Sequence, residues 1–238
     1  MLIETDAIIL HTIKYSETSI IAHIYTQQFG NGTYLMNNVR TNRSKMALFQ
    51  PLSLVHITAY RKKDPKQIHR ISSISFVEAP QNITNTFTKS SMALFIGEMV
   101  NRIFTEEEEF PEFFAYFKSF VLQLEQATTN YANLHLLFLL HVTEFLGVKP
   151  KNNFSAAMPI FSPIHAQFVE PETEENCLSR EQSLLLTKIL SLSQLTDTVE
   201  LTNSERQTIL HILLQYYDIH ICKTQNIKSF EILKMVFE

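Results

Sequence analysis

Apolar and polar residues alternate along the first third of the chain, with the period of two that is typical of strands. Runs rich in Ile, Val and Thr are separated by short turn-forming segments, one of them at residues 29–32, where two glycines lie close together. The predicted strands span residues 5–15, 19–26, 33–39, 52–60 and 67–77. Five strands in so short a segment favour a small closed or partly open barrel, because closure removes exposed strand edges.

After residue 80 the apolar residues recur at helical spacing instead. Helices are predicted at 92–103, 111–124, 131–146, 179–192 and 202–221, the last opened by overlapping capping boxes at Thr202/Glu205 and Ser204/Gln207, and a short helix follows residue 229. The segment 151–177 is irregular and contains three prolines. The chain is therefore predicted to be α+β, with a barrel domain at 1–80 and a larger helical domain at 81–238 that includes the insert 151–177.

The second of these helices carries a stripe of large apolar residues. The stripe consists of Phe113, Phe117, Phe120, Val121 and Leu124. We interpret it as part of the helical core, and the alternative is a groove for a partner.

Charge divides the chain in the same place. Residues 1–80 carry nine basic and five acidic side chains, a net charge of +4, whereas the remainder carries −8. Between residues 40 and 70 the only acid is Asp64, and the bases are Arg40, Arg43, Lys45, Arg61, Lys62, Lys63, Lys66 and Arg70. Such asymmetry indicates that the barrel meets a polyanion. The alternative is that these bases only keep the barrel in solution.

Three tyrosines in neighbouring predicted strands, Tyr25, Tyr34 and Tyr60, could offer stacking faces. Small barrels that bind single-stranded nucleic acid combine a basic groove with such aromatic platforms. Nothing in the sequence resembles a recognition helix, so sequence-specific reading is not indicated. The basic residues, with Tyr34 and Tyr60, are the predicted DNA-binding residues.

Motifs for catalysis, cofactors or metals are missing from the sequence. Only four glycines occur, too few for a phosphate-binding loop, and no nucleophile-elbow pattern is found. The histidines form no helical metal-binding pair, and Cys177 has no second cysteine at a zinc-ligand spacing. We predict a non-enzyme without metal or cofactor. Two isolated cysteines, together with the lack of a secretory signal and of a membrane span, predict a cytoplasmic protein.

Short motifs at both ends of the chain resemble the bacterial RecO family. At the start these are TDAIIL (5–10), YSETS (15–19), IYT (24–26) and FG (29–30), and at the end YY (216–217) and IKSFEIL (227–233). The order of elements between them also agrees. The resemblance implies an N-terminal OB-fold followed by a helical domain. It implies a recombination mediator of the RecF pathway that binds single- and double-stranded DNA and anneals complementary strands.

The resemblance also implies partners. Such proteins load the recombinase onto DNA coated by single-stranded-DNA-binding protein, together with RecR and, in many bacteria, RecF, in the nucleoid-containing cytoplasm. Many members carry a four-cysteine zinc module in the region that matches 151–177, where this chain has only His165 and Cys177.

Family members commonly contact the acidic tail of the coating protein through the helical domain. Arg102 and Lys118 are the only bases between residues 90 and 148, so they are the candidates for meeting that tail, unless they merely solvate helix faces. Two alternatives to a DNA-binding mediator stay open. One is a helical interaction adaptor whose barrel is only a scaffold, and the other is an enzyme with a dispersed site.

Overall fold

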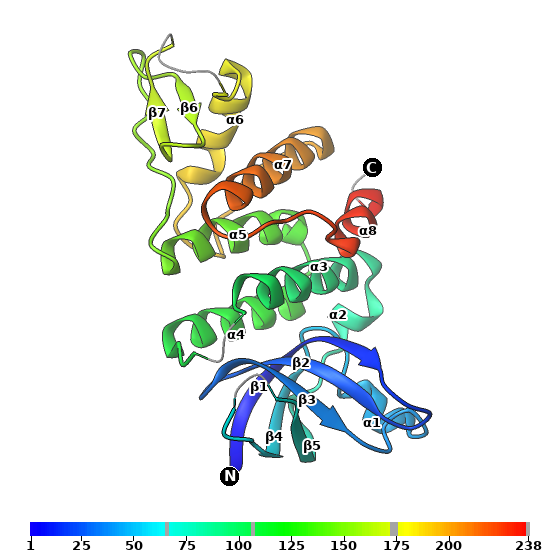
Figure 1. Ribbon diagram of the computed structural model, residues 1–238. Coiled ribbons are helices and arrows are strands. Elements are labelled where there is room, and N and C mark those ends of the chain that lie inside the picture. The colour runs from blue at the N-terminus through cyan, green and yellow to red at the C-terminus, as the bar shows by residue number, and fades with distance from the viewer. Residues whose placement is uncertain (65–66, 106–107, 172–175, 237–238) are drawn as a thin grey trace. The chain divides into compact units, whose positions relative to one another are not determined.

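The computed structural model describes residues 1–64, 67–105, 108–171 and 176–236 (Figure 1). Within these residues the chain forms two compact units. The barrel unit consists of residues 1–126 and 227–236, and the second unit consists of residues 127–226. The helices that follow residue 80 are therefore shared between both units, and the predicted domain boundary at residue 80 stays a prediction.

Five strands form a closed barrel in the order β1-β2-β3-β5-β4. They are β1 (Leu2–Lys14), β2 (Ile20–Thr26), β3 (Gly30–Met36), β4 (Leu54–Tyr60) and β5 (His69–Glu78). Neighbouring strands are antiparallel except β3 and β5, which pair in parallel. The predicted strands and the predicted α+β class are confirmed.

The turn between β2 and β3 lies earlier than predicted. Residues 27–29 make the turn, and β3 already begins at Gly30, where the predicted turn at 29–32 would have continued. Gly30 has φ +64°, and the Thr26 hydroxyl donates to its carbonyl oxygen at 3.1 Å. Because glycine adopts positive φ without a steric cost, this one residue completes the turn and starts the strand.

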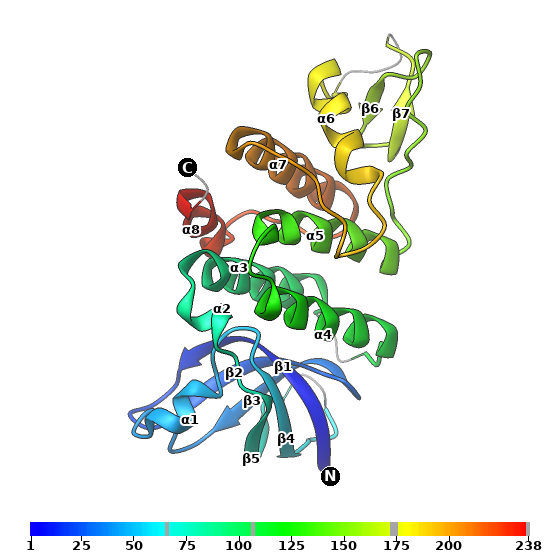
Figure 2. The same ribbon diagram turned by 180° about the vertical axis from the view of Figure 1, so that it is seen from behind.

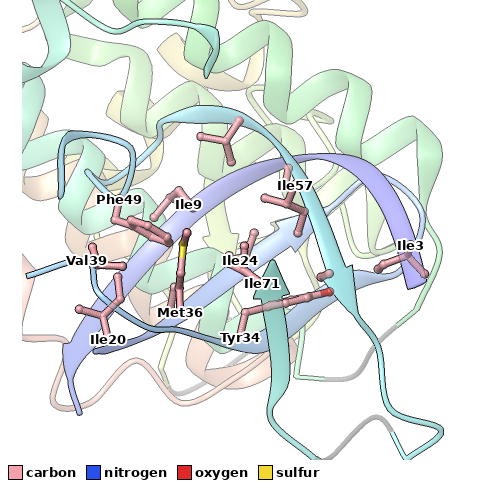
Figure 3. Close-up of a cluster of buried hydrophobic side chains, with 14 residues drawn as sticks. Ile3, Ile9, Ile20, Ile24, Tyr34, Met36, Val39, Phe49, Ile57 and Ile71 are labelled. Atoms are coloured by element: carbon pink, nitrogen blue, oxygen red, sulfur yellow. The ribbon is translucent and has the colours of Figure 1, made fainter. Parts of the chain in front are cut away.

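Alternate residues of the strands point into the barrel (Figure 3). The interior is filled mainly by Ile side chains, with Tyr34, Met36 and Phe49 as the largest other members. Tyr34 packs edge-on against the ring of the buried His69, with ring centroids 5.1 Å apart. A short helix, α1 (Arg43–Ala47), joins β3 to β4, and its N-terminal cap is Asn42, whose side chain accepts the Lys45 N–H at 3.1 Å.

Four helices complete the described part of the barrel unit: α2 (Asn82–Asn85), α3 (Phe87–Ile103), α4 (Pro111–Gln126) and α8 (Lys228–Val236). The α4 stripe at 113–124 is buried, which confirms it as core. Tyr25 of β2 meets this stripe edge-on, with ring centroids 5.2 Å from Phe113 and 6.3 Å from Phe117. An open apolar groove on this stripe is therefore excluded, because its side chains already fill the space between helix and barrel.

The C-terminal helix α8 packs beside α3, as Figures 1 and 2 both show. The carboxylate of Glu98 on α3 accepts hydrogen bonds from the backbone N–H groups of Lys228 and Ser229, at 3.2 and 3.1 Å. The Ser229 hydroxyl donates to the same carboxylate at 2.6 Å. An acid at this position suits the positive end of the helix dipole, so Glu98 holds the start of α8.

The second unit contains η1 (Tyr131–Asn133), α5 (Leu134–Phe145), β6 (Ile160–Ser162), β7 (Gln167–Val169), α6 (Arg180–Leu190) and α7 (Asn203–His220). Of the two overlapping boxes predicted before α7, the helix uses Thr202 and Glu205. The insert predicted as irregular holds the small β6–β7 sheet, and its residues 172–175 lie outside the described residues. In the described ranges, no helix is long and apolar enough to cross a membrane.

Candidate nucleic-acid interface

A groove with a volume of about 320 Å³ opens on the barrel beside α1. Three predicted DNA-binding residues, Lys45, Tyr60 and Arg70, line it together. The other lining residues are Met36, Asn37, Asn38, Ile71 and Ser72, and none of the lining residues is acidic. The groove thus offers two cations, one aromatic ring and neutral hydrogen-bonding groups.

The strand register explains why these residues meet. Arg70 of β5 lies opposite Tyr60 of β4 and, across the parallel pair, opposite Leu35 of β3. Residues that are directly opposite share one face of a sheet, so the Arg70 and Tyr60 side chains are neighbours on the outside of the barrel. Lys45 comes from α1, which the Asn42 cap fixes just after β3.

Tyr60 is well placed for stacking, because 57% of its surface is exposed. Arg70 is also exposed, and Lys45 is half-buried. A guanidinium group donates several hydrogen bonds in a fixed plane and suits phosphate, while a tyrosine ring suits the face of a base. The arrangement can therefore hold a sugar–phosphate backbone and one or more unpaired bases.

The basic loop between β4 and β5 continues directly from this groove. Lys62 and Lys63 are exposed on it, and the Lys62 N–H donates to Nδ1 of His69 at 3.2 Å. Arg61 has a structural contact instead: its guanidinium carbon lies 4.5 Å from the centre of the Phe29 ring. Lys66 lies outside the described residues.

Arg40 and Arg43 do not line the groove. The Arg40 guanidinium donates to the carbonyl oxygen of Ser16, and its backbone N–H donates to the carbonyl of Thr18 at 3.1 Å. Arg40 therefore fastens the loop between β1 and β2. Arg43 is exposed at the start of α1.

The prediction that Tyr34 is a stacking platform is wrong. Its side chain is 0% exposed and belongs to the barrel interior (Figure 3). Tyr25 is also buried, against the helices of the barrel unit. A base cannot reach either ring without opening the core, so Tyr60 is the one predicted tyrosine with an accessible face.

The two residues that are predicted to bind a partner peptide, Arg102 and Lys118, each lie beside a carboxylate of the chain itself. Lys118 Nζ lies 3.4 Å from Oδ2 of Asp6, whose other oxygen is 2.9 Å from Nδ1 of His56. Arg102 Nη2 lies 4.0 Å from Oε1 of Glu98. An acidic peptide would have to compete with these carboxylates, and the assignment stays a prediction.

The second unit carries a larger groove of about 560 Å³ that the sequence did not indicate. Its cation is Arg206, a buried residue whose Nε donates to Oδ1 of Asn133 and whose Nη1 donates to Oδ1 of Asn203, both at 2.8 Å. At its rim, Glu205 accepts a hydrogen bond from Lys188 at 2.6 Å, and this contact is the main reason that the pKa of Glu205 falls to about 2. The amide of Asn133, which is distant in the sequence, is a partner of Arg206 that no local spacing reveals.

Within the described ranges, no group of three or more His, Cys, Asp or Glu residues is placed to hold a metal ion. Neither Cys177 nor Cys222 takes part in a disulfide bond. The absence of a metal or cofactor stays a prediction, since part of the insert lies outside those ranges.

Comparison with known proteins covers almost the whole chain. Residues 1–80 match the family model described as "Recombination protein O N terminal", and residues 84–229 match "Recombination protein O C terminal". The chain is 30% identical over 251 residues to the DNA repair protein RecO of Bacteroides fragilis, and 31% identical over 247 residues to that of Flavobacterium psychrophilum. Each of these two matches covers the full length of this chain and of the relative. A more distant relative, from Porphyromonas gingivalis, is 26% identical over 249 residues.

These matches place the chain in a class, the bacterial proteins of DNA repair and recombination. Within that class, the chain belongs to the RecO family of DNA repair proteins.

Proposed function

We propose that this protein is a non-catalytic mediator of recombinational DNA repair, which binds single- and double-stranded DNA through its barrel and anneals complementary strands. The observation that carries the proposal is the groove in which Lys45, Arg70 and Tyr60 meet with no acid among the lining residues. The barrel is assigned as an OB-fold, residues 1–80, with a helical domain at 81–238. The closed five-stranded order supports this assignment, since OB-folds are small five-stranded barrels that bind oligonucleotides on one face.

The chemistry of the groove suits binding without sequence preference. Each phosphate that a cation neutralises releases counterions, and each base that stacks on an aromatic ring adds about 1–3 kcal/mol. Lys62 and Lys63 on the adjoining loop extend the positive surface beyond the groove. Annealing follows from the same charges, because neutralised backbones of two complementary strands repel each other less.

The partners are proposed from the family. We infer that the protein works in the cytoplasm, at the nucleoid, with RecR and with RecF where it is present, and that it helps to load the recombinase onto coated DNA. The acidic tail of single-stranded-DNA-binding protein is proposed to bind the helical domain at Arg102 and Lys118. Since residues 81–238 carry a net charge of −8, the contact must be short and local.

Titration of a labelled tail peptide tests the partner claim. The double variant Arg102→Glu/Lys118→Glu should bind the peptide more weakly than wild type, while Lys151→Glu/Arg180→Glu, which changes two exposed bases of the second unit, should not. Equal affinity of wild type and the Arg102/Lys118 variant would remove these residues from the site. If the peptide does not bind to wild type, the tail of single-stranded-DNA-binding protein is not a partner of this protein.

An annealing assay with two complementary oligonucleotides tests the function itself. Wild type and Lys151→Glu/Arg180→Glu should accelerate annealing, and Lys45→Glu/Arg70→Glu should have lost most of the acceleration. A wild type that neither binds nor anneals DNA would contradict the proposal and favour the alternative of a helical adaptor whose barrel is only a scaffold.

A further inference from the structure

Three aliphatic side chains form a row on the outside of the barrel. Ile13 of β1 lies opposite Ile21 of β2, and Ile21 lies opposite Leu35 of β3. Directly opposite residues share a face, so the three side chains are neighbours across three strands. Their sequence neighbours Ile20 and Met36 point into the barrel core (Figure 3), which places the row on the outer surface.

The row is accessible to solvent. Ile13 is 51% exposed, and Ile21 and Leu35 are half-buried. Outward positions of an antiparallel sheet are usually polar where nothing covers them. Three adjacent aliphatic residues at such positions therefore indicate a surface that binds something apolar.

The row continues without a gap into the groove described above. Leu35 lies opposite Arg70 across the parallel β3–β5 pair, and Arg70 lies opposite Tyr60. The apolar surface thus ends at a cation and an aromatic ring. The occupant must therefore present apolar groups to the row and an anionic group to Arg70.

We propose that the row Ile13–Ile21–Leu35 is the surface on which unpaired bases of single-stranded DNA pack, with Arg70 holding the backbone, and that it makes the barrel prefer single strands to duplex. This inference rests on the proposed DNA-binding function. In a duplex the faces of the bases are stacked on one another inside the helix, whereas an unstacked single strand presents them together with its phosphates. An apolar strip that ends at a cation fits the second arrangement.

Fluorescence anisotropy with a labelled single-stranded oligonucleotide and with its duplex tests the assignment. The variant Ile21→Thr/Leu35→Thr places threonine, a β-branched residue that suits strands, at both positions and removes much of the apolar surface. Ile13→Thr is a second variant at a more exposed position, where the fold is at less risk. Val77→Thr is the matched control, an exposed aliphatic residue of β5 that does not belong to the row.

The row variants should bind the single strand about five- to tenfold more weakly and the duplex unchanged, with Val77→Thr like wild type. Arg70→Gln should weaken both. Unchanged single-strand affinity in both row variants would overturn the inference while leaving the proposed function standing. An equal loss of affinity for the single strand and for the duplex would also overturn the inference. A wild type that binds neither DNA would remove the proposed function and the inference together.

Discussion

At the scale of single residues, burial separates side chains that look alike in the sequence. Tyr34 and Tyr60 are both strand tyrosines in the basic third of the chain, yet only Tyr60 has an exposed ring. Alternation did not reveal the difference, because β3 begins with Gly30 and Gly32, and glycine gives no apolar signal. Only the pairing of Tyr34 with Ala22 across β2 and β3 shows that its ring points inward.

Tyr60 should contribute to binding by stacking. The substitution Tyr60→Ser removes the ring from the groove and should weaken single-strand binding by roughly 1–3 kcal/mol, the usual value of one stacked base. Phe87→Ser, an exposed aromatic residue of α3, is the control and should bind like wild type. Equal affinities of Tyr60→Ser and wild type, measured by anisotropy, would show that no base stacks there.

His135 on α5 should make stability depend on pH. Burial, with the nearby positive charge of Arg206 as a smaller cause, lowers its pKa to about 3. The unfolded chain therefore takes up a proton near pH 6.5, where the folded chain does not. The free energy of unfolding is therefore highest above pH 6.5 and falls as the pH is lowered toward 3. At pH 5 this contribution of His135 has fallen by about 2 kcal/mol.

Urea unfolding at pH 7 and pH 5 measures this loss. His135→Gln should reduce the difference between the two free energies of unfolding, although the half-buried His23, whose partial burial lowers its pKa to about 4, keeps part of it. His165→Gln, at an exposed position, should keep the full difference. An undiminished difference in His135→Gln would contradict the assignment.

At the scale of elements, long periodic segments could be predicted and short ones could not. The strands and the long helices have enough turns or alternations to show their period, as the stripe of α4 does. The strands β6 and β7 have three residues each, too few for any period to appear. The groove could be predicted in part, because its cations and Tyr60 are among the predicted DNA-binding residues. That they meet beside Asn37 and Asn38 depends on the parallel pairing of β3 with β5, and the aliphatic row depends on the register of β1, β2 and β3, neither of which a local pattern shows.

The packing of α3 on β1 should depend on Gly97. A Cβ atom at this position would lie 2.4 Å from the carbonyl oxygen of Leu10, so the helix and the strand would have to separate. Gly97→Ala should destabilise the protein by about 1–3 kcal/mol in spite of alanine's better helix propensity. Ser119→Ala, at an exposed position of α4, should have little effect. A thermal melt in which Gly97→Ala equals or exceeds wild type would contradict this close approach.

At the scale of the whole molecule, the two parts of the chain carry opposite net charges, and we expect them to meet different kinds of partner. The +4 of residues 1–80 is expected to attract DNA, and the −8 of the remainder is expected to repel it. We propose that DNA binds in the groove between α1, β4 and β5. Since such binding rests on phosphate contacts, its affinity must depend steeply on salt.

The salt dependence of single-strand affinity, compared between wild type and Lys45→Gln/Arg70→Gln, tests whether DNA binds there. Each lost phosphate contact lowers the slope of log affinity against log salt by about 0.7 for a single strand, so the double variant should lose about 1.4. The control Lys151→Gln/Arg180→Gln should keep the wild-type slope. If the groove variant also keeps the wild-type slope and affinity, DNA does not bind in the groove.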